Sequence, residues 1–162
     1  MLFRSRVDQE LLLAHVLGVS RMELHARELS LDESQAEEFE RLLGERINGS
    51  PLQYLTGEAP FRYLTFSVGP GVLIPRPESE ALIDAILVEI EKRGNNQTSI
   101  VDLGAGSGAL AISIAYEALQ RGARVNVVAV EKEAEARSWL ERNIARHDVD
   151  VRVIAEIGRA HV

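Results

Sequence analysis

The sequence predicts an α/β protein in which a Rossmann-like, doubly wound sheet domain follows a small helical bundle and a β-hairpin linker. The first third repeats apolar residues at helical spacing. The middle places aromatic and β-branched residues between glycines and prolines, which is typical of a hairpin. The last third alternates β-branched runs with helical patterns, which favours a parallel sheet with helical crossovers. We expect the helical domain over residues 1–52, the linker over 53–75 and the sheet domain over 76–162.

The helical part is predicted to contain three short helices. The first covers residues 7–17 and is followed by Gly18, which suits the C′ position. Capping-box pairs precede the other two helices, namely Ser20 with Glu23 and Asp32 with Gln35. Three short helices make a poor core, so we expect this module either to lean on the next domain or to lack its first helix.

The sheet part begins with a helix after Pro75-Arg76-Pro77. Strands are then predicted at 99–102, 125–131 and 151–154, with helices at 109–120 and 133–147 between them. A doubly wound sheet usually has more strands than three, so we expect this domain to be truncated at its C-terminal side.

Both ends of the chain are compatible with translated sequencing adapter. Residues 2–5 can be encoded by CTCTTCCGATCT, and residues 156–160 by GAGATCGGAAGAGCA. The reverse complement of the first string lies within the second. We therefore expect residues 1–5 and 156–162 to be translated adapter and not genuine protein. The sequence of the source DNA at both ends tests this expectation.

Composition excludes several classes of function. A net charge of −7 disfavours direct binding of nucleic acid. The absence of cysteine excludes disulfides and thiolate metal sites and fits a cytoplasmic protein. No apolar run has the length of a membrane span, and no signal peptide is recognisable. The four histidines lack metal-ligand spacing and no catalytic constellation can be assigned, so we predict no metal site and name no catalytic residue.

The strongest candidate site is a glycine turn between a predicted strand and a predicted helix. It comprises Asp102, Gly104, Ala105, Gly106, Ser107 and Gly108. Alternating glycines allow positive φ and close approach of a ligand to the backbone. An acid at the strand tip disfavours a phosphate and favours a cationic or hydroxyl-bearing ligand, which suits S-adenosylmethionine. The same residues also satisfy the G-x-G-x-x-A pattern of nicotinamide dinucleotide sites, so this alternative stays open.

Two further segments are candidates for the same pocket. Glu131 ends the second strand, where an acid suits hydrogen bonds to ribose hydroxyls, and beside the glycine turn we prefer this role to that of a solvated strand-end carboxylate. The stretch Pro75-Arg76-Pro77-Glu78 has the pattern of a helix start, and it could equally form an arm that covers a cofactor pocket.

Four stretches in this order resemble the HemK family, the peptide-chain release factor glutamine N5-methyltransferases. They are residues 11–18 (LLLAHVLG), 51–57 (PLQYLTG), 72–80 (VLIPRPESE) and 102–108 (DLGAGSG). The resemblance covers about Asp8 to Val153, and the Ile-Pro-Arg-Pro-Glu stretch is its most specific part. It implies methyl transfer from S-adenosylmethionine to the glutamine amide of a release factor's Gly-Gly-Gln motif. It also implies that residues 104–108 cradle the cofactor, that Glu131 binds its ribose and that the helical domain recognises the release factor.

One departure from the family is serious. The family's Asn-Pro-Pro-Tyr motif, which holds the glutamine amide, does not occur in the chain. We therefore expect the chain as given to be a fragment without catalytic activity. The alternatives are a ribosomal-protein glutamine methyltransferase, a nicotinamide-dependent oxidoreductase that uses the same turn, and a non-catalytic binding remnant.

Overall fold

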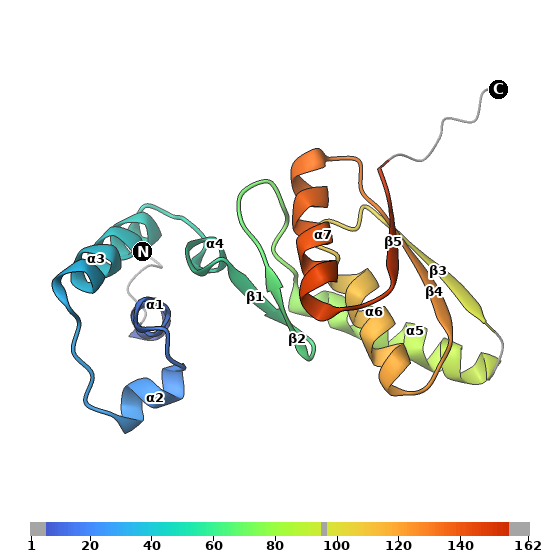
Figure 1. Ribbon diagram of the computed structural model, residues 1–162, viewed down its shortest axis with the longest axis horizontal. Helices are drawn as coiled ribbons and strands as arrows, with labels where there is room; N and C mark the ends of the chain where they lie inside the picture. Colours follow the sequence, from blue (N-terminus) through green and yellow to red (C-terminus); the bar gives the residue numbers. More distant parts are fainter. Residues whose placement is uncertain (1–5, 95–96, 156–162) are drawn as a thin grey trace. The chain divides into compact units, whose positions relative to one another are not determined.

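The computed structural model describes residues 6–94 and 97–155 (Figure 1). The expectation that residues 1–5 and 156–162 are adapter-derived lies outside the described residues. The chain forms two compact units, one up to Gly57 and one from Glu58 onwards. The finer division expected at 52/53 and 75/76 stays a prediction.

The first unit is helical, as predicted. It contains α1 (Arg6–Leu17), α2 (Arg21–Ala26), α3 (Glu33–Ile47) and α4 (Leu52–Thr56). Both capping boxes are formed, and Gly18 adopts φ 64° after α1. The sequence did not predict α4, because five residues are too few to show a helical period.

Leu12, Ala14 and Leu42 form the buried centre of this unit. An ion pair ties α3 to α1, since Arg46 Nε lies 2.9 Å from Asp8 Oδ2. The same guanidinium donates to the carbonyl of Ser50 at 2.9 Å, which fixes the chain where α3 ends.

The second unit begins with the predicted hairpin. Strands β1 (Glu58–Phe61) and β2 (Leu64–Ser67) pair antiparallel, with Glu58 opposite Ser67. Arg62 in the turn has φ 54°, an unusual value for a residue with a side chain. Ala59, Phe61 and Phe66 are buried, so the hairpin belongs to the core of this unit.

A parallel sheet follows, as predicted, with the strand order β3-β4-β5. Its strands are β3 (Thr98–Leu103), β4 (Val125–Val130) and β5 (Val151–Ile154). The helices are the one-turn η1 (Pro77–Ser79), α5 (Glu80–Arg93), α6 (Ala109–Gln120) and α7 (Ala134–His147). Helix α6 is the most buried, because it contacts β4 and also packs against α5 and α7.

Predicted boundaries in this unit differ by one residue at both ends of β3, at the end of β4 and at the start of α7. Strand β4 ends at Val130, and the N–H of Glu131 still donates to the carbonyl of Ile154 in the neighbouring strand at 3.0 Å. Helix α7 starts at Ala134, with Glu133 as its N-cap. These shifts place Glu131 in the loop that faces the glycine turn.

In the described part of the chain, β3 pairs with β4 alone. Val101 and Leu103 on β3 are 58% and 64% exposed. No helix among the described residues is both long enough and apolar enough to cross a membrane.

Candidate functional site

The glycine turn joins β3 to α6 and is held mainly by its own backbone. The N–H groups of Gly104 and Ala105 donate to the carbonyl of Val130 at 2.8 and 3.0 Å. The N–H of Gly108 donates to the carbonyl of Ala105 at 2.8 Å and closes the turn. All three glycines have positive φ, at 78°, 55° and 84° for Gly104, Gly106 and Gly108. The predicted strand–turn–helix geometry is therefore present.

The three glycines are required for different reasons. A Cβ at Gly104 would meet no atom within 4 Å, and one at Gly106 would approach only Val72 Cγ2 at 3.9 Å. The backbone at these two positions is therefore open to a ligand. A Cβ at Gly108 would lie 2.4 Å from Leu140 Cδ1. Gly108 thus allows α6 to pack on α7, and its contact with a cofactor stays a prediction.

Asp102 lies at the tip of β3 with its carboxylate largely buried. The carboxylate accepts a hydrogen bond from the backbone N–H of Ala111, in the first turn of α6. The other oxygen, Oδ2, is buried and has no hydrogen-bond partner in the structure. Burial raises the pKa of Asp102, and the negative charge of Glu131 raises it further. A buried acceptor of this kind suits a cationic or hydroxyl donor.

Glu131 holds the turn from its other side. It is 8% exposed, and its two oxygens accept N–H bonds from Gly106 and Glu133, each at 2.9 Å. A carboxylate has about four acceptor positions, so these two bonds leave some unused, and binding of ribose hydroxyls by Glu131 stays a prediction. The interpretation of Glu131 as a solvated strand-end acid is wrong, because the side chain is buried and organises the turn.

The residues just before the predicted arm approach the turn and α7. Val72 is buried beside Gly106, since a Cβ at Gly106 would lie 3.9 Å from Val72 Cγ2. Trp139 on α7 donates from Nε1 to the carbonyl of Pro70 at 3.1 Å. Pro75 is half-buried, whereas Arg76, Pro77 and Glu78 are exposed where η1 begins. Their participation in a cofactor pocket stays a prediction.

Sequence reasoning missed Asn143, a fully buried residue on α7. Its Nδ2 donates to the carbonyl of Ser107 at 2.9 Å. Asn143 follows Ala136 and Leu140 on the buried side of the helix. A polar residue at an apolar helical position is the signal that could have identified it.

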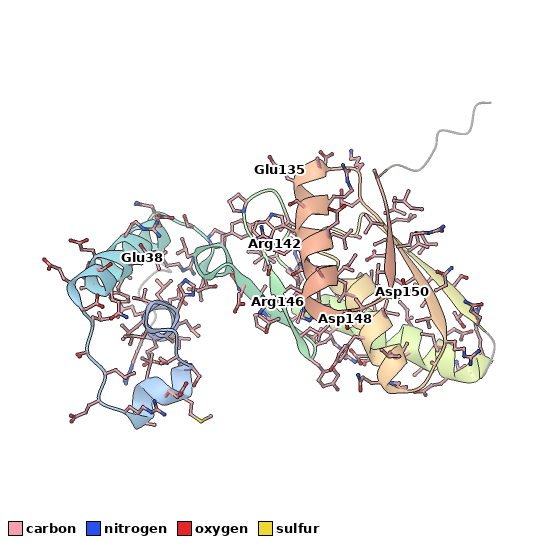
Figure 2. The ribbon with its side chains drawn as sticks, viewed as in Figure 1. Glu38, Glu135, Arg142, Arg146, Asp148 and Asp150 are labelled. Carbon is pink, nitrogen blue, oxygen red and sulfur yellow. The ribbon has the colours of Figure 1, made fainter. Side chains whose placement is uncertain are left out.

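Helix α7 also carries charged residues that hold the hairpin. Figure 2 shows Arg146 near the C-terminal end of this helix. Its guanidinium lies 2.7 Å from Glu58 Oε1 and donates to Ser67 Oγ at 3.1 Å.

Within residues 6–94 and 97–155, no group of three or more His, Cys, Asp or Glu side chains could hold a metal ion.

Two family models match the chain. The model described as the PrmC N-terminal domain matches residues 4–57, and Conserved hypothetical protein 95 matches residues 52–160. Among solved structures, a putative class I S-adenosylmethionine-dependent methyltransferase from Listeria monocytogenes has a TM-score of 0.45 at 14% identity. That match covers 95% of this chain and 46% of that chain.

Curated relatives share one name, release factor glutamine methyltransferase. The protein from Bifidobacterium longum is 41% identical over 142 residues, which cover 85% of this chain and 47% of the relative. The protein from Chlorobaculum tepidum is 40% identical over 154 residues, with 91% and 50% covered. The protein from Escherichia coli is 36% identical over 143 residues, with 88% and 49% covered. The chain, which spans about half the length of these relatives, belongs to the release factor glutamine methyltransferase family.

Proposed function

We propose that the second unit binds S-adenosylmethionine at the glycine turn. The observation that carries this proposal is the buried, unpartnered Oδ2 of Asp102 beside the carboxylate of Glu131. The cofactor brings a positively charged amine and sulfonium, a ribose and no phosphate. Two acids therefore favour it electrostatically, and Gly104 and Gly106 leave the backbone open to it.

The hydrogen bonds of the turn argue against a nicotinamide dinucleotide. A pyrophosphate is bound by free backbone N–H groups at a glycine turn and helix N-terminus. Here the N–H groups of Gly104, Ala105, Gly106 and Gly108 already donate to Val130, Glu131 and Ala105. A pyrophosphate bound at these four N–H groups would have to displace these bonds, and the two acids would repel it. The oxidoreductase alternative is therefore disfavoured.

The substrate proposed for the whole protein is a peptide-chain release factor. The methyl group passes from the cofactor to the side-chain amide nitrogen of the glutamine in the Gly-Gly-Gln motif. The relatives' shared name and the match of the first unit to the PrmC N-terminal domain support this proposal. The first unit then serves to recognise the release factor, and the reaction takes place in the cytoplasm, where translation ends.

The 162 residues alone are proposed to bind the cofactor without transferring its methyl group. An amide nitrogen is a poor nucleophile because its lone pair is delocalised, so a site must orient it and stabilise the developing positive charge. In the family this is the task of the Asn-Pro-Pro-Tyr motif, which does not occur in these residues. The residues that are present supply cofactor binding.

A chimera tests this proposal. The chain is fused to the C-terminal segment of the Bifidobacterium longum relative, chosen to include the family's Asn-Pro-Pro-Tyr motif. The unfused chain and the chimera are incubated with tritiated S-adenosylmethionine and with a mixture of a release factor and ribosomal proteins. We expect label on the release factor only with the chimera, and none when the Gly-Gly-Gln glutamine is replaced by alanine. Label on a ribosomal protein in place of the release factor would overturn the substrate, and no label on either would overturn the methyltransferase proposal.

A further inference from the structure

We propose that Asn143 is a positioning residue that couples the β1–β2 hairpin to the glycine turn. Cofactor affinity would then depend on how the hairpin packs against α7. This inference rests on the proposed function. It starts from the three hydrogen bonds of one fully buried amide.

On the hairpin side, Asn143 binds the backbone of Ser67 in β2 at both of its polar groups. The N–H of Ser67 donates to Oδ1 at 2.7 Å, and Nδ2 donates to the carbonyl of Ser67 at 3.0 Å. This pairing fixes which end of the amide is oxygen, because the Ser67 N–H needs an acceptor. A strand edge is thus bound by a side chain in place of another strand.

On the turn side, the second hydrogen of Nδ2 goes to the carbonyl of Ser107 at 2.9 Å. Ser107 is 3% exposed, so this bond cannot be replaced by bulk water. The next N–H along the chain, that of Gly108, closes the turn onto Ala105. Asn143 therefore sets the orientation of the 107–108 peptide, directly after the open backbone at Gly106.

The two attachments share one rigid group. A planar amide that shifts to follow Ser67 also moves its Nδ2 relative to Ser107. His147 and Arg146, on the next turn of α7, hold the carbonyl of Thr65 and the side chain of Glu58, so the hairpin is seated on the same helix. By linkage, a ligand that rigidifies the turn also stabilises the packing of the hairpin against α7. Equally, a change that stabilises this packing strengthens binding of the ligand.

The test compares Asn143→Asp with a control that lowers stability elsewhere in the same unit. The aspartate keeps the shape of the side chain and removes both donors. Ile90→Ala, on α5, opens a cavity beside Leu87 and Ala118 without touching Ser67 or Ser107. Affinity for S-adenosylhomocysteine is measured by calorimetry, and amide hydrogen exchange is measured by NMR with and without this ligand.

We expect Asn143→Asp to weaken S-adenosylhomocysteine binding about tenfold or more, and Ile90→Ala to weaken it less than about twofold. In the unaltered chain, the ligand should slow exchange at the Ser67 amide. Equal losses of affinity in the two variants, or exchange at Ser67 that ignores the ligand, would overturn the coupling. If Asn143→Asp does not fold, Asn143→Ser, which keeps one donor, takes its place under the same criteria.

The outcomes separate this inference from the proposed function. Failure of the unaltered chain to bind S-adenosylhomocysteine overturns the proposed function. In that case the coupling is judged without ligand, where Asn143→Asp must speed exchange at both Ser67 and Gly108. Faster exchange at one of these amides alone would refute the coupling.

Discussion

At the scale of single residues, Asp102 combines a structural bond with a carboxylate oxygen that has no partner. The bond to the Ala111 N–H stabilises the start of α6, while burial of the charge costs free energy. A carboxyl group whose pKa is raised by folding stabilises the protein below its ordinary pKa, and this contribution is lost as pH rises through the raised value. Stability therefore falls as pH rises above the ordinary pKa of an aspartate.

Replacing Asp102 by asparagine should change the pH dependence of stability. The variant cannot ionise, so the unfolding free energy of the unaltered chain should fall relative to that of Asp102→Asn as pH rises from about 4 to about 7. Denaturant titrations at several pH values measure this difference. Asp150→Asn, at an exposed position, is the matched control and should show a smaller slope. A difference that grows as pH falls would contradict the assignment.

Gly108 is predicted to be the turn glycine least tolerant of a side chain. Alanine there would combine φ 84° with a contact of 2.4 Å to Leu140 Cδ1, so Gly108→Ala should cost about 2–4 kcal/mol of stability. Gly122→Ala, with φ 69° and open space, should cost only about 1 kcal/mol. Chemical denaturation of the two variants measures these costs. Equal losses would show that packing at Gly108 is unimportant.

Several residues of the site could be predicted from the sequence, and others could not. The spacing of Asp102, Gly104, Gly106 and Gly108 predicted the turn because glycine conformations and strand–helix boundaries are local properties. Asn143 was missed because its partners, Ser67 and Ser107, are 76 and 36 residues away along the chain. A single sequence contains no local signal of such contacts beyond a polar residue on an apolar face.

At the scale of elements, the hairpin turn is fixed to α5 and α6 by Arg62. Its guanidinium makes two bonds to Glu117, at 2.8 and 2.7 Å, and one to Asp84 at 2.8 Å. The N–H of Arg62 also donates to Glu80 at 3.0 Å, which helps to hold its positive φ. Together with Asn143 at β2, these bonds hold the hairpin at both of its ends.

Breaking the buried ion pair should loosen the hairpin strongly. Glu117 is 5% exposed, so Glu117→Gln should cost about 3 kcal/mol by leaving the Arg62 charge without its buried partner. Glu89→Gln, which removes an exposed partner of Arg93, should cost less than about 1 kcal/mol. Thermal and denaturant unfolding compare the two. Similar losses would mean that the buried pair adds nothing beyond a surface pair.

Capping residues predict helix boundaries well, because they act within one turn of the helix. The Asp32 carboxylate accepts from the Gln35 N–H at 2.8 Å, and the Asp32 N–H donates to the side-chain oxygen of Gln35. The five-residue α4 escaped prediction because neither its length nor Pro51 at its N-cap supplies such a signal. The end of β4 lies one residue before the predicted end, at Val130, although the N–H of Glu131 still donates to β5.

At the scale of the whole molecule, alternating strands and helices predicted the parallel order β3-β4-β5. This succeeded because right-handed crossovers allow few other arrangements. The first compact unit ends at Gly57, and the hairpin belongs to the second unit, where Phe66 packs on His147 of α7. Alternating apolar residues in a hairpin do not reveal which unit they face.

Calorimetric titration of this chain with S-adenosylhomocysteine, followed by NADH, tests whether the glycine turn binds S-adenosylmethionine. We expect saturable binding of S-adenosylhomocysteine at one site, loss of that binding in Gly106→Asp, and no competition from NADH. Binding of NADH without binding of S-adenosylhomocysteine would instead assign the turn to a dinucleotide. Binding of neither would show that the turn in this chain is a structural remnant.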